Sequence, residues 1–177
     1  AMRIEAGARL TKLFAPYMGE AWTMERAGKR VRRSVDAVTR GRAGAVEMAQ
    51  REKVPGTGPN VKPMSKIARL VAVLNMGNAG NLQRLIDGYG WSESDALAIL
   101  DTLTKEDMDF VQGVWDYIEE YWVEVADLQR RIAGVAPKKI QRQALETRHG
   151  TYAGGYFPVV YDTAQSPRAW QDSVANA

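Results

Sequence analysis

His149 is the residue best suited to acid–base chemistry in this chain of 177 residues, because it is the only histidine and imidazole titrates near neutral pH. It lies in the segment 148–162, where paired glycines, aromatic residues and β-branched residues replace the helical pattern of the preceding chain. Any catalytic triad would have to use this imidazole, and no recognised nucleophile motif lies near it. We therefore expect His149 to support the local structure beside Gly150, and we predict no catalytic residue and no cofactor.

A row of acidic residues offers a second chemistry, that of a site for a hard cation. The row consists of Asp109, Asp116, Glu120 and Asp127, whose intervals of seven, four and seven place them on one face of a helix. Calcium sites use a loop with an oxygen-rich turn, which this row lacks. We therefore expect these carboxylates to be solvated or to pair with basic residues near the N-terminus, and we predict no metal site.

Seven basic residues form the pattern that points to nucleic acid. They are Arg26, Lys29, Arg30, Arg32, Arg33, Arg40 and Arg42. Residues 1–53 carry 12 Lys and Arg against 6 Asp and Glu, whereas residues 104–127 carry one Lys against eight acids. Blocks of opposite charge attract each other, so basic and acidic helices lying side by side are the favoured interpretation. Binding of nucleic acid is the alternative, although the basic segment lacks the interleaved aromatic residues of a stacking platform.

Apolar residues at steps of three and four predict helices through most of the chain. The expected helices before residue 90 span Arg3–Phe14, Gly19–Lys53, Ile67–Gly77 and Asn78–Ile86, the last closed by Gly88 and Gly90. Residues 54–63 contain three prolines and two glycines and must form a loop or linker, which makes them the best internal boundary. In the helix after this loop, we expect Ile67, Leu70, Val71 and Leu74 to form one compact apolar face.

Two capping boxes mark the starts of the next helices. Ser92 with Asp95 begins one helix, with Leu97, Ile99 and Leu100 on its apolar side, and Thr104 with Asp107 begins another. The second helix is expected to run to about residue 133, where Gly134 and Pro137 end it. Its apolar stripe consists of Met108, Val111, Trp115, Ile118, Trp122, Val125 and Ile132. We interpret Trp115 and Trp122 as core anchors of a central helix with other helices packed around it.

Strand-like residues follow Pro137. The segments 144–147 and 155–161 predict a small hairpin or two extended arms. Gly154 and Gly155 permit a turn, and Tyr156 and Phe157, together with Val159 and Tyr161, are available to cover the central helix as a clasp. The expected fold is mainly α: a multi-helix bundle around a long central helix at about 104–133, with a small β-hairpin or extended segment near 143–162. The expected division is a basic N-terminal helical region (1–53), a linker or loop (54–63), a helical core domain with its clasp (64–162) and a flexible tail (163–177).

Three carboxamides, Asn75, Asn78 and Asn81, recur at steps of three and are interleaved with Gly77 and Gly80. We expect them to cap two helices and to bind backbone groups of a neighbouring loop. The stretch is no phosphate loop, because it lacks the lysine and the following Ser or Thr of that motif.

Composition excludes several classes of protein. Hydrophobic residues make up 45% and charged residues 25% of the chain, which argues against disorder throughout. The absence of cysteine excludes disulfides and thiolate metal sites. No apolar run approaches the roughly 20 residues that cross a bilayer, so we expect a soluble chain with no membrane partner. The opening Ala1-Met2 looks like a vector scar, and we expect the chain to be a fragment of a larger protein.

An ordered series of motifs across about residues 66–162 resembles a helical module of very large tailed-bacteriophage proteins, the polyvalent proteins of phages and mobile elements. The motifs are Leu74-Asn75-Met76-Gly77-Asn78 with Asn81, Arg84, Leu85 and Gly88; Leu103-Thr104 with Asp107, Phe110-Val111 and Trp115-Asp116; Gly134-Val135 with Pro137; and Gly154-Gly155-Tyr156-Phe157-Pro158 with Tyr161-Asp162. The resemblance implies a non-enzymatic accessory region beside catalytic modules elsewhere in the polypeptide. It implies partners among the other domains of that polypeptide or among phage and host proteins, and a location in the virion or the host cytoplasm.

These observations lead to two main hypotheses. The first is a structural or protein-interaction domain of a large phage-associated protein, and the alternative is a non-specific nucleic-acid binder that uses the basic N-terminal helix. A weaker third hypothesis is an enzyme with a site between His149, the segment 154–158 and the acidic helix.

Overall fold

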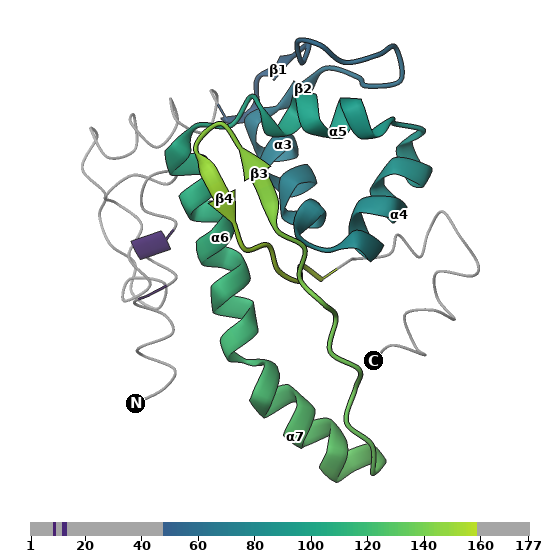
Figure 1. The fold of residues 1–177 in the computed structure, drawn as a ribbon, viewed down its shortest axis with the longest axis vertical. Coiled ribbons are helices and arrows are strands. Elements are labelled where there is room, and N and C mark those ends of the chain that lie inside the picture. Colours follow the sequence, from purple (N-terminus) through teal and green to yellow (C-terminus); the bar gives the residue numbers. More distant parts are fainter. Residues whose placement is uncertain (1–8, 10–11, 14–47, 159–177) are drawn as a thin grey trace, which may run out of the picture.

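The computed structural model describes residues 9, 12–13 and 48–158, and within them the protein is mainly helical (Figure 1). Its elements are β1 (Arg51–Glu52), β2 (Met64–Ser65), α3 (Lys66–Leu74), the 3₁₀ helix η2 (Asn75–Gly77), α4 (Ala79–Tyr89), α5 (Glu93–Leu100), α6 (Lys105–Glu120), α7 (Trp122–Ala133), β3 (Leu145–Thr147) and β4 (Gly150–Tyr152). The strands form two antiparallel pairs, β1 with β2 and β3 with β4. The prediction of a mainly α fold with a small hairpin is thereby confirmed.

A polar side chain begins each of the helices α3 to α6. The capping residues are Ser65, Asn78, Ser92 and Thr104, and each accepts a hydrogen bond from the backbone N–H three residues further on. Both predicted capping boxes are confirmed, since the carboxylates of Asp95 and Asp107 accept hydrogen bonds from the backbone of Ser92 and Thr104. Local side-chain chemistry therefore sets where these helices start.

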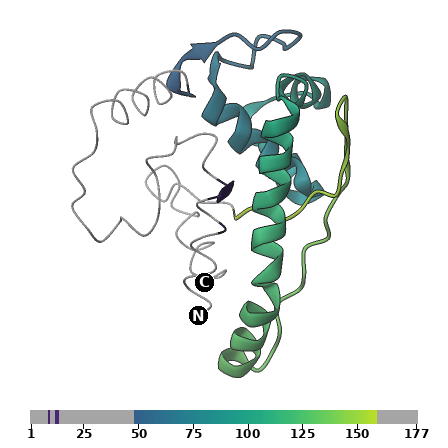
Figure 2. The same cartoon turned by 90° about the vertical axis from the view of Figure 1, so that its left-hand side faces the viewer.

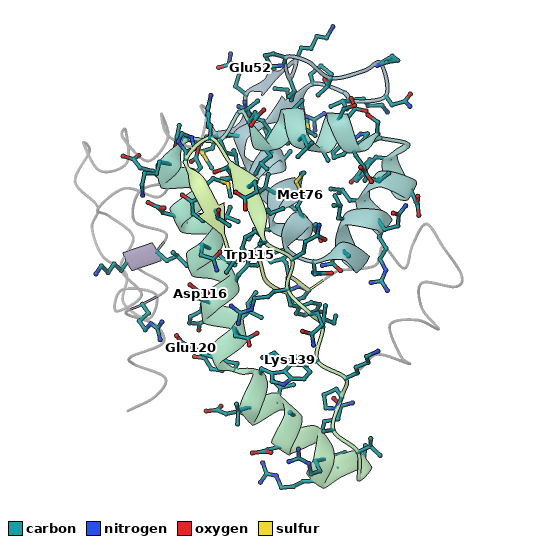
Figure 3. All side chains as sticks on the ribbon, viewed as in Figure 1. Glu52, Met76, Trp115, Asp116, Glu120 and Lys139 are labelled. Carbon is teal, nitrogen blue, oxygen red and sulfur yellow. The ribbon has the colours of Figure 1, made fainter. Side chains whose placement is uncertain are left out.

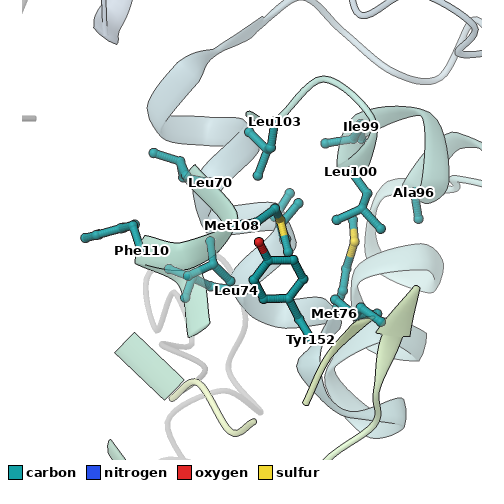
Figure 4. Close-up of a cluster of buried hydrophobic side chains, with 14 of the residues drawn as sticks. Leu70, Leu74, Met76, Ala96, Ile99, Leu100, Leu103, Met108, Phe110 and Tyr152 are labelled. Atoms are coloured by element: carbon teal, nitrogen blue, oxygen red, sulfur yellow. The ribbon is translucent and has the colours of Figure 1, made fainter. Parts of the chain in front are cut away.

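The hydrophobic core lies where α3, α5, α6 and the β3–β4 hairpin meet (Figure 4). Its fully buried side chains include Val73, Ile99, Met108, Val111 and Trp115. The ring of Tyr152 extends from β4 into the same cluster (Figure 4). The proline-rich loop over residues 54–63 also belongs to this core, because its Val54 and Val61 are almost completely buried.

The structure divides the predicted helix 104–133 at Tyr121. The Tyr121 N–H donates to the carbonyl of Ile118, a tighter i→i+3 hydrogen bond, before α7 resumes. The run Tyr121-Trp122-Val123 consists of aromatic and β-branched residues, which have lower helix propensity than the residues around them. Figure 2 shows that α7 extends beyond the body of the protein, and that the segment 134–144 returns alongside it. Gly134 ends α7 with a left-handed φ of 73°.

Packing around this helix therefore differs between its halves. Met108, Val111 and Trp115 of the predicted stripe are buried in α6, whereas Val125 and Ile132 are exposed in α7 and Trp122 is half-buried. Among the described residues, the second half of the predicted helix is therefore less covered than the first. Periodicity indicates the apolar side of a helix but does not show how much of that side is covered.

Two further boundaries differ from the sequence prediction. The helix expected to continue to Lys53 ends at Ala49, because Arg51 and Glu52 pair with β2 instead. The second arm of the hairpin is Gly150–Tyr152, not residues 155–161, since the chain turns back directly after Arg148 and His149. Most of the predicted helices 3–14 and 19–53, the arm beyond Pro158 and the tail 163–177 lie outside the described residues. Among the described residues, no helix is long and apolar enough to cross a membrane.

Candidate interaction surfaces

The carboxamides and the paired glycines come together in one structural junction. The carbonyl of Gly77 accepts hydrogen bonds from the N–H of Gln143 (2.8 Å) and of Gly155 (2.9 Å). The Nδ2 of Asn78 donates to the carbonyl of Gly155 (3.3 Å), while its Oδ1 accepts from the Asn81 N–H and caps α4. The C-terminal segment 153–158 is thus fastened to the turn between α3 and α4. We call this arrangement the clasp junction.

Asn81 and Trp115 extend the clasp junction on either side. The Nδ2 of Asn81 donates to the carbonyl of Phe157 (2.8 Å), and the indole Nε1 of Trp115 donates to the carbonyl of Leu74 (2.9 Å). Figure 3 shows Trp115 between α6 and the chain that follows the hairpin. The side chain of Asn75 instead donates from Nδ2 to the carbonyl of Val71 in the preceding helix α3.

Three glycines make the clasp junction sterically feasible. A Cβ on Gly155 would lie 2.4 Å from Cβ of Trp115, and a Cβ on Gly77 would lie 2.6 Å from the backbone of Gly155. Gly154 combines a left-handed φ of 74° with a Cβ position only 2.0 Å from the carbonyl of Gln143. These residues therefore serve close packing, and the half-buried Tyr156 and Phe157 follow them, with Phe157 packed against the core.

His149 belongs to a polar cluster where the β3–β4 turn meets the start of α6. Its Nε2 lies 3.1 Å from the carbonyl of Leu103, to which Nη2 of Arg148 also donates. Nearby, the hydroxyl of Tyr152 donates to Asp109 (2.9 Å). Burial and this hydrogen bond raise the pKa of Tyr152 above its ordinary value. These contacts dock the hairpin onto α6.

The acidic row has a separate partner at each position. Asp109 pairs with Lys105 (2.6 Å), Asp116 accepts from Gln112 (2.9 Å), Glu120 pairs with Arg9 and Asp127 pairs with Arg130 (2.6 Å). The hydrogen bond from Lys105 is the main cause that lowers the pKa of Asp109. Across the described residues, no group of three or more His, Asp or Glu is placed to hold a metal ion. The pair between Glu120 and Arg9 joins α6 to the N-terminal region.

All seven basic residues of the nucleic-acid hypothesis, Arg26, Lys29, Arg30, Arg32, Arg33, Arg40 and Arg42, lie outside the described residues. Their arrangement on a helix therefore stays a prediction.

An open groove lies beside α3, between β2 and the end of α4. It has a volume of about 660 Å³, within the usual range for ligand sites. Its apolar lining comprises Met64, Ile67, Val71, Leu85, Tyr89 and Trp91. The rings of Tyr89 and Trp91 stack with centroids 4.9 Å apart. We call this surface the α3 groove.

The α3 groove combines exposed apolar side chains with positive charge. Ile67 is 49% exposed, Val71 44% and Tyr89 64%, although all three are large and apolar or aromatic. Arg51 and Lys62 also line the groove, and no acidic residue does so among the described residues. Asn60 donates from Nδ2 to the carbonyl of Gly90 (2.6 Å), which fastens the loop wall to the end of α4.

A second apolar surface covers α7 and the segment that follows it, which together we call the α7 arm (residues 122–144). Its exposed large apolar side chains are Val123, Val125, Leu128, Ile132, Val135 and Ile140. Ion pairs from Lys139 and Arg142 to Glu119 fasten the returning segment to the end of α6. Figure 3 shows Lys139 and Glu120 near the start of this arm.

Sequence reasoning missed both surfaces because it assigned several of their residues, among them Ile67, Val71, Val125 and Ile132, to packed helix faces. In α3, Leu70 and Leu74 are buried as expected, but Ile67 and Val71 line the groove instead of the core. In α5, Leu97 is 57% exposed although it was expected on the apolar side. The sequence did contain one signal for the α3 groove. The apolar face of α3 is wider than the surface that one packing partner covers.

Comparison with known proteins gives no relative on which to base a function: no family model matches the chain, and neither a curated protein nor a solved structure matches it.

Proposed function

We propose that this chain is a non-enzymatic protein-interaction domain of a larger phage-associated protein, and that its α3 groove binds an acidic, amphipathic helical segment of a partner. The observation that carries the proposal is the exposure of Ile67, Val71 and Tyr89 in one groove with a basic rim. The phage context comes from the resemblance of the motifs over residues 66–162. This resemblance supports a phage-associated parent protein and gives no support to the α3 groove as a binding site.

The apolar lining favours a peptide as the occupant. Ile67 and Val71 of α3 and Asn75 at the start of η2 follow each other at steps of four, so they line about 12 Å of the groove. Amphipathic helices bind such grooves through apolar residues at steps of three and four. Burying the exposed parts of these side chains would contribute the hydrophobic part of the affinity.

The charge of the rim favours an acidic partner. Arg51 and Lys62 lie on the groove, and its remaining polar lining is supplied by Asn60, Ser65 and Asn75. Carboxylates on a bound helix would find cations there and no like charge among the described lining residues. A basic partner would lose this attraction, so the sign of the partner's charge provides a direct test.

The test is an NMR titration of the isotope-labelled chain with two synthetic peptides of about 18 residues, or five helical turns. Both peptides carry leucines at steps of three and four; one has glutamate and the other lysine at the remaining positions. We expect the glutamate peptide to shift the amide signals of Ile67, Val71 and Tyr89 and the indole signal of Trp91, while the lysine peptide shifts none of them. Equal shifts with both peptides, or no shift with either, would refute the groove as an acidic-peptide site.

Matched variants distinguish peptide binding in the α3 groove from peptide binding to exposed apolar side chains elsewhere. Ile67→Asp should weaken binding of the glutamate peptide at least tenfold. Leu97→Asp, an equivalent change at an exposed apolar residue outside the groove lining, should leave binding unchanged. Equal loss with both variants would show that the peptide binds elsewhere.

The nucleic-acid alternative requires its own titration, with duplex and single-stranded DNA and RNA at two salt concentrations. Binding through the basic segment 26–42 should fall steeply as salt rises, because released counterions drive it. Absence of binding at low salt would remove this alternative. Binding of single-stranded DNA that shifts Tyr89 and Trp91 would instead assign the groove to nucleic acid.

A further inference from the structure

We propose that α7 pairs with the α7 of a second copy of this chain, in antiparallel orientation about a two-fold axis. This inference concerns a different surface from the α3 groove, and it holds or fails independently of the function proposed above.

The first observation is an apolar stripe on a helix that extends beyond the body of the protein (Figure 2). Val125, Leu128 and Ile132 of α7 follow each other at steps of three and four, the spacing of a coiled-coil seam, and the half-buried Tyr121, directly before α7, precedes Val125 by four residues. Val125 is 49% exposed, Leu128 50% and Ile132 77%. Ala126 is buried and Trp122 is half-buried, and both lie on another side of α7 than this stripe.

The second observation is the charge beside this seam. Glu124 and Arg131 are seven residues apart, so both border the seam on the same side. In an antiparallel pair, the same side of each helix faces its counterpart. Alignment of Val125 with Leu128 of the second copy then places Glu124 beside Arg131 of that copy. The two-fold axis repeats the pair, so each dimer contains this attraction twice.

Parallel pairing has no such complement. In a parallel pair, the position occupied by Glu124 faces the position occupied by Gln129, which is neutral. The other cation of α7, Arg130, pairs with the carboxylate of Asp127 at 2.6 Å, whereas the Nε of Arg131 donates a longer hydrogen bond, of 3.4 Å, to the backbone carbonyl of Asp127. The apolar stripe alone could bind many kinds of helix. The charges beside it favour a second copy of this chain in antiparallel orientation.

The length of α7 fixes the strength of the contact. Twelve residues make about three turns, and such a contact falls below the roughly 1,200 Å² of typical stable interfaces. We therefore expect a weak dimer that forms at high protein concentration. Its dissociation constant should lie between about 10 μM and 1 mM, since small interfaces of modest apolar area reach only these affinities.

The test is sedimentation equilibrium of the full chain at low salt, from about 10 μM to about 1 mM. We expect the apparent mass to rise from that of the monomer, 19.6 kDa, toward twice that value. Leu128→Asp should abolish the rise, whereas the control Leu97→Asp, on an exposed position of α5, should leave it unchanged. Circular dichroism and the melting temperature of each variant verify that the fold is retained.

Charge reversal tests the register itself. Glu124→Arg alone and Arg131→Glu alone each create two like-charge contacts per dimer, so each should raise the dissociation constant several-fold. The combined variant restores opposite charges and should return the dissociation constant to within about twofold of the original. A monomer at all concentrations, a dimer insensitive to Leu128→Asp, or a combined variant no better than the single ones would each overturn the proposal.

Discussion

Replacing Asn78 by alanine should destabilise the protein strongly, because this side chain holds two parts of the fold at once. Its Oδ1 caps α4, and its Nδ2 donates to the buried Gly155 on the C-terminal segment. Loss of a cap costs about 1 kcal/mol, and a buried carbonyl left without its donor costs about 1–3 kcal/mol more. Asn78 is 1% exposed, so water replaces neither interaction readily. The expected total is about 2–4 kcal/mol.

A serine at the same position separates the two contributions. Asn78→Ser keeps an oxygen that can cap α4 but removes the donor to Gly155, so it should cost about 1 kcal/mol less than alanine. Ser92→Ala removes a cap without any clasp bond and should cost about 1 kcal/mol.

The measurement is urea unfolding followed by tryptophan fluorescence and by far-ultraviolet circular dichroism. Each kcal/mol should also lower the Tm by roughly 2–4 °C in a protein of this size. If Asn78→Ala cost no more than Ser92→Ala, the bond between Asn78 and Gly155 would contribute nothing, and the clasp junction would not be a stabilising feature.

Further predictions concern the clasp junction and the loss of stability at acid pH. Gly155→Ala should cost about 1–3 kcal/mol by overpacking, whereas Gly88→Ala, with open space around its Cβ position, should be neutral or stabilise by up to about 1 kcal/mol in the same unfolding assay. Backbone hydrogen bonds from Gly58 in a neighbouring loop and from Ser92 at the α5 cap lower the pKa of Asp95 below its ordinary value of 3.8. Its charged form is therefore favoured in the folded state, and this contribution is present above pH 3.8 and lost as pH falls through the lower, folded pKa. Asp95→Asn should lower the free energy of unfolding at neutral pH. In urea titrations at different pH values, the variant should also lose less of this free energy below pH 3.8 than the original protein does. Replacing Tyr156 and Phe157 together by alanine should lower the Tm without changing the shifts that the glutamate peptide produces; an unchanged Tm with lost peptide binding would contradict their assignment to packing.

Local chemistry was the predictable part of this fold. A serine or threonine with an aspartate three residues later satisfies the backbone groups at a helix start, so the positions of α5 and α6 could be inferred from Ser92 and Thr104 alone. A glycine in the left-handed conformation ends a helix for an equally local reason, as Gly90 and Gly134 do.

Contacts between distant segments were less predictable. The composition of residues 155–161 favours a strand, but Gly155 packs against Trp115 and its N–H donates to Gly77. That pairing depends on three segments meeting, which no short window of sequence encodes. Periodicity has the same limit in α7, since the apolar side of a helix is visible in sequence while its covering partner is not.

Two positions that were expected in the core, Ile67 and Val71, support the proposed peptide binding instead. Leu70 and Leu74 of α3 reach the core, while Ile67 and Val71 stay exposed beside them. Because burial supplies most of the free energy of folding, a side chain that stays exposed contributes little to it. Ile67→Asp and Leu128→Asp should therefore change the free energy of unfolding by only about 0.5 kcal/mol. If either variant unfolded the protein, its side chain would have a structural role, and the surface it lines could no longer be assigned to a partner.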